Sequence, residues 1–162
     1  MEAAATDRDL QYLRHAIARS AAAKARGKHP FAAVIVDDRD EVLAETSNAV
    51  GWPDGDATGH AELLAVREAS RHFPPERLAQ ATLYSSAEPC AMCAGAVYWA
   101  SLGRVVYALS EARLRTLTGD HPANPTLALP CREVFARGQR AIVVVGPLLE
   151  DEAAAPHLGF WG

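Results

Sequence analysis

Two short segments of the chain bring together residue types that bind metals and move protons. One segment reads HAE at positions 60–62, and the other reads PCAMC at positions 89–93. Thiolate sulfur and neutral imidazole nitrogen are preferred ligands of zinc, and a carboxylate next to the metal can carry protons. The expected ligands of one zinc ion per chain are His60, Cys90 and Cys93.

The spacing of the two cysteines suits a single metal ion. Positions i and i+3 on a helix are neighbours on one face, so Cys90 and Cys93 can reach the same ion. A first helical turn also lowers thiol pKa values, because its free N–H groups and its dipole favour negative charge. With His60 the set has three protein ligands, the number typical of catalytic zinc, whereas structural sites use four. Cys131 stands in no metal-site pattern, so the count favours a site that is open to water.

Glu62 is expected to be the general acid and base of this site. Zinc lowers the pKa of water, and a neighbouring carboxylate can accept the proton and pass it on. His60 and Glu62 are two residues apart, so on an ideal helix their side chains would point to different sides. The interpretation therefore requires the metal to lie beyond the end of a helix, where both side chains can reach it.

Each pattern also has a simpler explanation. A Cys-x-x-Cys pair can be a redox site or half of a structural zinc knuckle. A histidine before a helix is usually a polar surface residue, and Glu62 in a first turn can serve only to stabilise the helix dipole. Because the two patterns occur together in order, each opening a predicted helix, we favour catalytic zinc.

The composition limits the class of protein. The chain has 162 residues, 49% of them hydrophobic, and we expect one globular domain over residues 1–162. Its formal net charge is −4, whereas nucleic-acid binders carry basic surfaces that neutralise phosphates. A small-molecule substrate is therefore expected, and nucleic acid is disfavoured as a partner.

The cysteines and the N-terminal residues bear on location. Three cysteines with one close pair make a poor disulfide framework. Residues 1–9 are acidic and lack an apolar stretch, so no secretory signal is expected, and no apolar run is long enough to span a membrane. We expect a cytoplasmic protein without a membrane partner.

Strands and helices are predicted to alternate along the chain. The helices are expected over 7–25, over 58–72 with Thr58 as N-cap, over 90–101 after Pro89 in the first helical position, and over 148–155. Short apolar runs predict strands over 31–36, 41–46, 81–86, 104–109 and 141–145, and residues 118–130, with three prolines, predict a loop. This alternation favours an α/β fold, a three-layer α/β/α sandwich around a mixed sheet of about five strands.

On these residues the chain resembles the cytidine deaminase-like superfamily. The HAE and PCAMC segments match its H-x-E and P-C-x-x-C signature, and the resemblance covers residues 30–145. Residues 88–100, EPCAMCAGAVYWA, look most like bacterial guanine deaminases and tRNA adenosine deaminases. The resemblance implies the same sandwich fold and the hydrolysis of the exocyclic amine of a nucleobase-like ring. It also implies a homodimer, for which the apolar helix at 90–101 is a suitable buried element.

The resemblance further implies substrate contacts outside the metal site. Asn48 matches an asparagine that contacts the base, although a turn residue is the simpler interpretation. Phe31 matches a residue beside the pocket, and an apolar core position is its alternative. Glu111 falls where relatives place an acidic or polar contact, but it can equally be an exposed residue that starts a helix. Ala61, inside the first motif, completes this group of expected contacts.

The C-terminal segment departs from the tRNA enzymes, whose last helix tends to be basic. Here residues 150–152 are acidic, and Phe160 and Trp161 follow near the end. Guanine deaminase-like relatives close the pocket over a free base with C-terminal residues, often aromatic, and aromatic rings stack well on flat heterocycles. We expect Phe160 and Trp161 to close the pocket, with a frayed tail or a dimer contact as the alternative.

Three functions remain open on this evidence. A metabolic deaminase of a free base or nucleoside, acting on guanine, isoguanine, cytosine or a related ring, agrees with the acidic charge and the aromatic tail. A tRNA-specific adenosine deaminase would need a basic groove, and a non-catalytic zinc-binding module would have no use for Glu62. No role is assigned to Cys131, His15, His29, His72, His121 and His157.

Overall fold

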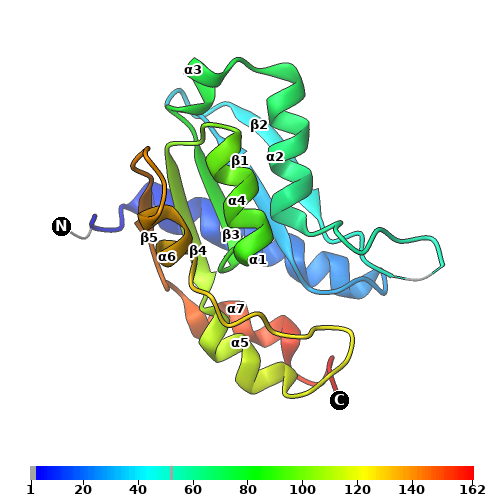
Figure 1. Ribbon diagram of the computed structural model, residues 1–162. Helices are drawn as coiled ribbons and strands as arrows, with labels where there is room; N and C mark the ends of the chain where they lie inside the picture. Colours follow the sequence, from blue (N-terminus) through cyan, green and yellow to red (C-terminus); the bar gives the residue numbers. More distant parts are fainter. Residues whose placement is uncertain (1–2, 52) are drawn as a thin grey trace.

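The computed structural model describes residues 3–51 and 53–162, coloured along the chain in Figure 1. Its strands are β1 (Ala32–Val36), β2 (Val42–Ser47), β3 (Thr82–Ala87), β4 (Arg104–Leu109) and β5 (Val143–Val145). Its helices are α1 (Asp7–Ala25), α2 (Ala61–His72), α3 (Pro75–Leu78), α4 (Ala91–Trp99), α5 (Glu111–Thr118), α6 (Cys131–Ala136), α7 (Glu150–Ala154) and the 3₁₀ turn η1 (Ala155–His157). Within the described residues, no helix has the length and apolar character that crossing a bilayer requires.

The strands form one mixed sheet in the order β2-β1-β3-β4-β5. Strand β1 runs antiparallel to both β2 and β3, whereas β3, β4 and β5 run parallel to one another. The turn between β1 and β2 is held by Asp37, whose Oδ1 accepts hydrogen bonds of 2.9 Å from the backbone N–H groups of Arg39 and Glu41. Strands β1 and β2 thus form a hairpin, and the predicted mixed sheet is confirmed.

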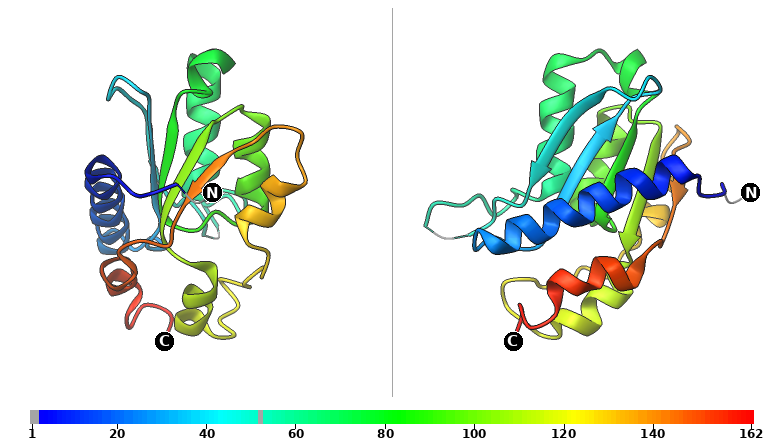
Figure 2. Two further views of the ribbon diagram at one scale, coloured as in Figure 1. Left: turned by 90° about the vertical axis from the view of Figure 1, so that its left-hand side faces the viewer. Right: turned by 180° about the vertical axis from the view of Figure 1, so that it is seen from behind.

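Helices cover both faces of this sheet. Figure 2 (left) shows the sheet nearly edge-on, with α1 and α7 on one face and α2, α4 and α6 on the other. Every residue of β1 and β3 is buried, as expected of apolar strands that are covered on both faces. The predicted three-layer α/β/α sandwich is thus the observed architecture.

Helix α1 begins and docks through one buried carboxylate. Thr6 and Asp9 form a reciprocal capping box, in which Oγ1 of Thr6 accepts from the Asp9 amide and the Asp9 carboxylate accepts from the Thr6 amide. The same carboxylate accepts hydrogen bonds of 2.6 and 2.8 Å from Arg104 on β4. Burial raises the pKa of Asp9, but the bonds from Arg104 and Thr6 outweigh it and lower this pKa to about 2. The helix predicted over 7–25 is found with those bounds.

Four strand ends meet at one edge of the sheet and supply the residues around the site. Because β2, β3 and β4 point in the same direction and β1 points in the opposite one, the start of β1 and the ends of the other three lie together. Phe31 precedes β1, Asn48 follows β2, Cys90 lies just beyond β3, and Glu111 lies just beyond β4. Ligands commonly bind at the carboxyl edge of parallel strands in α/β sheets.

Two predicted helix starts are wrong by a few residues. Helix α2 begins at Ala61 with His60 as N-cap, and the hydroxyl of Thr58 instead donates to Asp56 at 2.8 Å. Helix α4 begins at Ala91 with Cys90 as N-cap, so Pro89 precedes the helix and does not occupy its first position. The short helices α3 and α6 were not predicted, because four and six residues are too few to display a helical period.

Candidate active site

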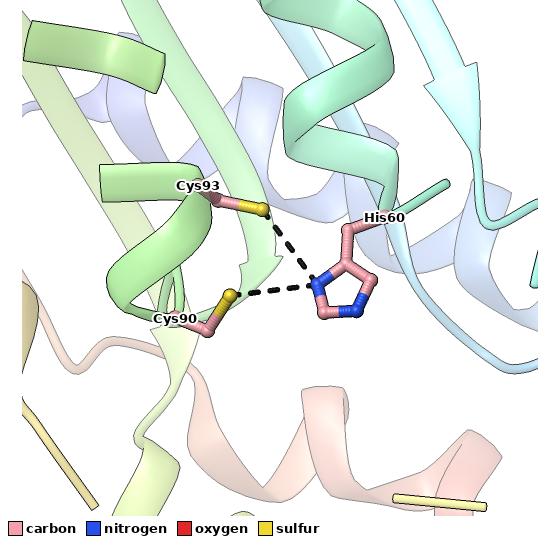
Figure 3. A group of neighbouring side chains, drawn as sticks. All are labelled: His60, Cys90 and Cys93. Carbon is pink, nitrogen blue, oxygen red and sulfur yellow. Dashed lines mark hydrogen bonds between the residues drawn. The ribbon is translucent and has the colours of Figure 1, made fainter. Parts of the chain in front are cut away.

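Three side chains from two helix starts converge on one point, as Figure 3 shows. Nδ1 of His60 lies 3.5 Å from Sγ of Cys90 and 3.7 Å from Sγ of Cys93, and the three ligand atoms lie within 4.8 Å of one another. Zn–S bonds of about 2.3 Å and Zn–N bonds of about 2.05 Å in tetrahedral geometry separate nitrogen from sulfur by about 3.6 Å. The observed spacing therefore fits one tetrahedral zinc ion without movement of the backbone.

Helix caps place these ligands. His60 and Cys90 are both N-cap residues with extended backbone angles, and neither side chain caps its own helix. Their side chains are therefore free to meet in front of the N-termini of α2 and α4, which pack side by side (Figure 1). His60 lies outside the helical part of α2, which satisfies the requirement that the metal lie beyond the end of a helix.

The ligand set favours thiolate at Cys90. A hydrogen bond from the Cys93 thiol is the largest effect, and with His60 it lowers the pKa of Cys90 to about 4. The Cys90 sulfur in turn raises the pKa of His60, and its hydrogen bond with Cys93 raises the pKa of the Cys93 thiol. The Cys93 thiol thus keeps its proton beside the Cys90 thiolate, whereas zinc requires both cysteines in deprotonated form, so zinc binding would displace protons from this set.

Glu62 lies in the first turn of α2 and is almost fully buried, with 5% of its surface exposed. Burial raises the pKa of its carboxyl group, and negative charge at Cys90 adds to this effect. The Ser85 hydroxyl lies 2.9 Å from Oε1 of Glu62 and 2.6 Å from the carbonyl oxygen of Ala87. Because this hydroxyl has one proton, it can donate to only one of the two acceptors at a time. Ser85 on β3 is a partner of Glu62 that the sequence analysis missed.

A cavity of about 330 Å³ opens next to these groups. Its walls come from the sheet edge, from α2, α4 and α5, and from the segment between α5 and α6. The lining residues are His29, Phe31, Asn48, Val50, Ala57, His60, Ala61, Glu62, Ala87, Glu88, Cys90, Met92, Glu111, Leu114, Ala123, Asn124, Pro125, Thr126 and Leu127.

Asn48 lines this cavity and also forms a turn, so the turn interpretation is confirmed, whereas contact with the base stays a prediction. Its side-chain Oδ1 accepts a hydrogen bond of 2.9 Å from the backbone N–H of Val50. The backbone N–H of Asn48 donates to the carbonyl oxygen of Phe31. The Val50 N–H group requires an acceptor, and this fixes the orientation of the side-chain amide. The amide nitrogen of Asn48 remains as a hydrogen-bond donor at the cavity wall.

Phe31, Ala61 and Glu111 also line the cavity. Glu111 is the first residue of α5 and is partly buried rather than exposed. Burial, with a smaller effect of negative charge at Cys90, raises the pKa of Glu111 to about 7. Phe31, Asn48, Ala61 and Glu111 therefore lie at the same cavity as His60, Glu62 and Cys90.

The C-terminal aromatic residues lie elsewhere, in a layer behind the cavity wall. Phe160 and Trp161 are not among the lining residues, which differs from their expected place over the base. The Trp161 ring lies 5.0 Å from that of His29 and 6.2 Å from that of Phe31, which do line the cavity. Trp161 is 5% exposed, and its Nε1–H donates to Nδ1 of His157 at 3.0 Å. The last residues therefore support the wall and are neither frayed nor in direct reach of the cavity.

The sequence analysis missed several wall residues. Residues 123–127 were placed in a loop without a role, and His29 was given none, yet all of them line the cavity. Glu88 lines it as well and is discussed below. No local pattern marks these residues, because their position depends on how the segment between α5 and α6 folds back over the sheet edge.

The charge of the wall is negative. Glu62, Glu88 and Glu111 line the cavity, and the lining set of the described chain contains neither lysine nor arginine. A phosphate group would meet carboxylates there without a cation to pair with it. The cavity is thus suited to an uncharged, hydrogen-bonding molecule.

Comparisons with known proteins agree with this site. A family model of the cytidine and deoxycytidylate deaminase zinc-binding region matches residues 6–109. The probable cytosine deaminase of Schizosaccharomyces pombe is 43% identical over 156 residues, which cover 96% of this chain and 94% of the relative. The tRNA-specific adenosine deaminase of Haemophilus influenzae is 36% identical over 103 residues, 64% of this chain and 59% of that protein.

A solved relative extends the match to the fold. The structure of guanine deaminase from Nitrosomonas europaea matches with a TM-score of 0.69 at 28% identity and covers 97% of this chain and 85% of that one. The family match includes His60, Glu62, Cys90 and Cys93. The chain therefore belongs to the cytidine and deoxycytidylate deaminase family, a zinc-binding family, and His60, Cys90 and Cys93 lie close enough together to form a zinc site.

Proposed function

We propose that this protein is a zinc-dependent enzyme that hydrolyses the exocyclic amine of a free nucleobase, with a cytosine-like ring as the first candidate and a guanine-like ring as the second. Water and the aminated ring are converted to the keto ring and ammonia. The observation that carries the proposal is the small cavity, which joins the zinc ligands and buried Glu62 to a wall without lysine or arginine. The near full-length similarity to a probable cytosine deaminase supports the choice of ring.

The residues of the chain divide the chemistry among them. Zinc held by His60, Cys90 and Cys93 would lower the pKa of water, so that it attacks at neutral pH. Glu62 accepts the proton of this water, delivers it to the ring nitrogen beside the reacting carbon, and assists the departure of ammonia. The raised pKa of Glu62, caused by burial, suits a group that must both accept and return a proton.

Two wall residues are placed to recognise the ring edge. The amide nitrogen of Asn48 can donate to a carbonyl oxygen of the base, since its Oδ1 is occupied by Val50. The Glu111 carboxylate can accept from a ring N–H group, which a free base has and an N-linked nucleoside lacks at the glycosidic position. This donor–acceptor pair favours a free base over a nucleoside.

The second candidate function, as distinct from the choice of ring, is that of a tRNA-specific adenosine deaminase, because relatives with that function match the chain, one of them over 103 residues. Each phosphate contact of a nucleic-acid binder needs a positive or hydrogen-bonding partner near the site. The negative cavity wall and the net charge of −4 speak against this candidate.

The test is ammonia release from zinc-loaded protein over cytosine, guanine, adenine, cytidine and a tRNA anticodon stem-loop, with E62Q measured in parallel. We expect turnover of a free base, lost in E62Q while the zinc content stays at one ion per chain. Turnover of the stem-loop alone would replace the proposal with the second candidate. No turnover of any substrate by folded, zinc-loaded protein would instead favour a non-catalytic zinc module.

We also propose a homodimer that forms through α4. Trp99 is 84% exposed and Met92 on the same helix is also exposed, and large apolar side chains on a helix surface commonly mark an interface. Light scattering after size-exclusion chromatography should give a dimer for the wild type and a monomer for W99E. A monomeric wild type would contradict this part of the proposal.

A further inference from the structure

Glu88 is a buried carboxylate with an unusual pair of partners. It is 8% exposed and lies between the end of β3 and the zinc ligand Cys90. Its Oε2 accepts a hydrogen bond of 3.0 Å from the amide of Glu111, and its Oε1 accepts one of 3.1 Å from the amide of Cys131. Each oxygen of one side chain thus binds a different, distant part of the backbone.

Both partners are the first residues of helices. Glu111 starts α5 and Cys131 starts α6, so the donated N–H groups are among those that a helix cannot satisfy internally. A carboxylate at such a position is also favoured by the helix dipole. In addition, the backbone N–H of Glu88 donates to the carbonyl of Leu109 at 2.7 Å, so Glu88 holds both sides of the turn from β4 to α5.

These two helices carry the cavity wall that faces the zinc ligands. Helix α5 supplies Glu111 and Leu114, and the segment that leads into α6 supplies residues 123–127. Cys90 follows Glu88 by two residues on the same short stretch of chain. Glu88 therefore connects the metal side of the site to this wall by hydrogen bonds, in addition to the packing of α4 against α6.

We propose that Glu88 is a positioning residue that sets the substrate-facing wall of the cavity at a fixed distance from the zinc ligands. The consequence for catalysis rests on the proposed function, because the wall is taken to bind the base. Glu88 acts through Glu111 and residues 123–127. Without Glu88, the starts of α5 and α6 lose the carboxylate that binds both of them. His60 and Cys90 remain in place as the N-cap residues of α2 and α4.

Glu150 on α7 offers a matched control, because its carboxylate also binds the start of α5. Oε2 of Glu150 accepts hydrogen bonds of 3.0 and 2.9 Å from the amide and hydroxyl of Ser110, the N-cap of α5. Glu150 does not line the cavity. E150Q therefore removes a carboxylate from the same helix start without touching the connection to the zinc ligands.

The primary test compares E88Q with E150Q. A glutamine offers one carbonyl oxygen, so one of the two backbone N–H groups would face its amide group and lose its acceptor. We expect E88Q to raise KM for the base about tenfold or more while kcat changes less than about threefold, which is a loss of ground-state binding. Zinc content should stay at one ion per chain, and E150Q should leave KM unchanged.

Hydrogen–deuterium exchange gives a readout that needs no substrate. In E88Q, peptides covering 110–118 and 126–136 should exchange faster than in the wild type, whereas peptides covering α2 and α4 should not. This result decides the positioning role even if the wild type deaminates no tested base, so its failure is separate from failure of the proposed function.

A second pair of variants removes a single hydrogen bond. C131P deletes the Cys131 N–H donor, and proline suits the first position of a helix. Pro130, with φ −58° and ψ 141°, already has the conformation that a following proline requires. C131A keeps the N–H group and serves as the control for loss of the thiol. We expect C131P, but not C131A, to reproduce the faster exchange around 126–136.

Three results would overturn the proposal. One is an unchanged KM and unchanged exchange in E88Q. Another is an equal effect of E150Q, which would reduce Glu88 to general stabilisation of α5. The third is loss of zinc from E88Q, which would place its action on the metal ligands and not on the wall.

Discussion

The two sides of the cavity are built in different ways. The metal side uses residues from two short motifs, 60–62 and 90–93, held in front of two neighbouring helix starts. The opposite side combines the end of β2, the start of α5 and residues 123–127, and it is backed by the C-terminal Trp161. Chemistry is thus encoded locally, whereas the shape that selects a substrate is encoded by contacts between distant segments.

This difference has a consequence for variation among relatives. A change on the metal side alters groups that every substrate needs, whereas a change on the opposite side alters only which ring fits. The relatives are named for three different substrates, cytosine, guanine and tRNA adenosine, which agrees with this division. The comparison can be tested by substitutions on either side.

The largest expected effect is that of E62Q on the metal side. Gln keeps the size of the side chain but cannot accept the proton, so kcat should fall by about 10²–10⁴-fold, the usual contribution of a general acid or base. Steady-state ammonia release and metal analysis would measure this change at constant zinc content. E111Q is the comparison from the other side, and it should act mainly on KM. Equal kcat effects of both substitutions would break the division between the two sides.

W161A tests the support of the opposite wall. Removal of a buried tryptophan should cost about 3–5 kcal/mol of unfolding free energy, and His29 and Phe31 would lose their backing. We expect a lower urea midpoint and a higher KM, with zinc still bound. W161F keeps one aromatic ring but loses the hydrogen bond to His157 and part of the buried ring volume, so it should be milder than W161A. Loss of zinc from W161A would show that the two sides are not independent.

The acid stability of the same region follows from His157. Burial, with smaller effects of Lys24 and His29, lowers the pKa of His157 from 6.5 to about 4. Between these values the unfolded chain binds a proton that the folded chain does not, so stability falls as the pH drops from about 6.5 to 4 by up to about 3 kcal/mol. Glu111, with its pKa raised to about 7, acts in the opposite direction over much of this range. Urea unfolding at several pH values should therefore show the His157 contribution as a difference between the wild type and a variant without this histidine.

The matched control for that slope is H157N. Asparagine offers an acceptor for the indole N–H of Trp161 but does not titrate. As the pH falls from about 6.5 to 4, H157N should lose less unfolding free energy than the wild type does. Asp9, with a pKa of about 2, contributes only below this range because its unfolded value is 3.8. An undiminished slope in H157N would assign the acid sensitivity to other groups.

The smallest expected effect is that of N48D. Aspartate keeps an acceptor for the Val50 amide but removes the donor that faces the cavity. Loss of one such hydrogen bond to the substrate, about 1–3 kcal/mol, should raise KM by about 10–100-fold. N48A should in addition lower stability, because the Val50 N–H would lose its partner. An unchanged KM in N48D would remove Asn48 from substrate recognition.

The sequence predicted much of the fold because its elements have clear local signals. The helix at 7–25 and the strand at 104–109 have the predicted bounds, since apolar periodicity and flanking polar residues mark both. Helix starts were harder to place. Thr58 is a favourable N-cap type, yet it bonds to Asp56, and the zinc ligand His60 occupies the cap position instead.

The residues of the candidate site were likewise predicted only in part. The zinc ligands and Glu62 were predicted because two short motifs combine metal-binding residue types at characteristic spacings and match a family signature. The roles of Glu88, Ser85 and His29 depend on contacts across the sheet, such as the bond from Cys131 to Glu88, which joins residues 43 positions apart. Such contacts leave no periodic pattern in the sequence. Trp161 is the clearest example of what the sequence alone does not predict. Its aromatic character was evident, but its position behind the cavity wall was not.

The two outer strands of the sheet bear on how copies of this protein can associate. An open sheet edge presents unpaired backbone groups that can recruit another strand and lead to aggregation. One edge here, β5, has only three residues, and the other, β2, carries Glu45 in ion pairs with His15 and Arg19. Neither edge is a long, flat, apolar template. Self-assembly by pairing of edge strands is therefore disfavoured. The helical surfaces remain as places where a second copy can bind without aggregation through the sheet edges.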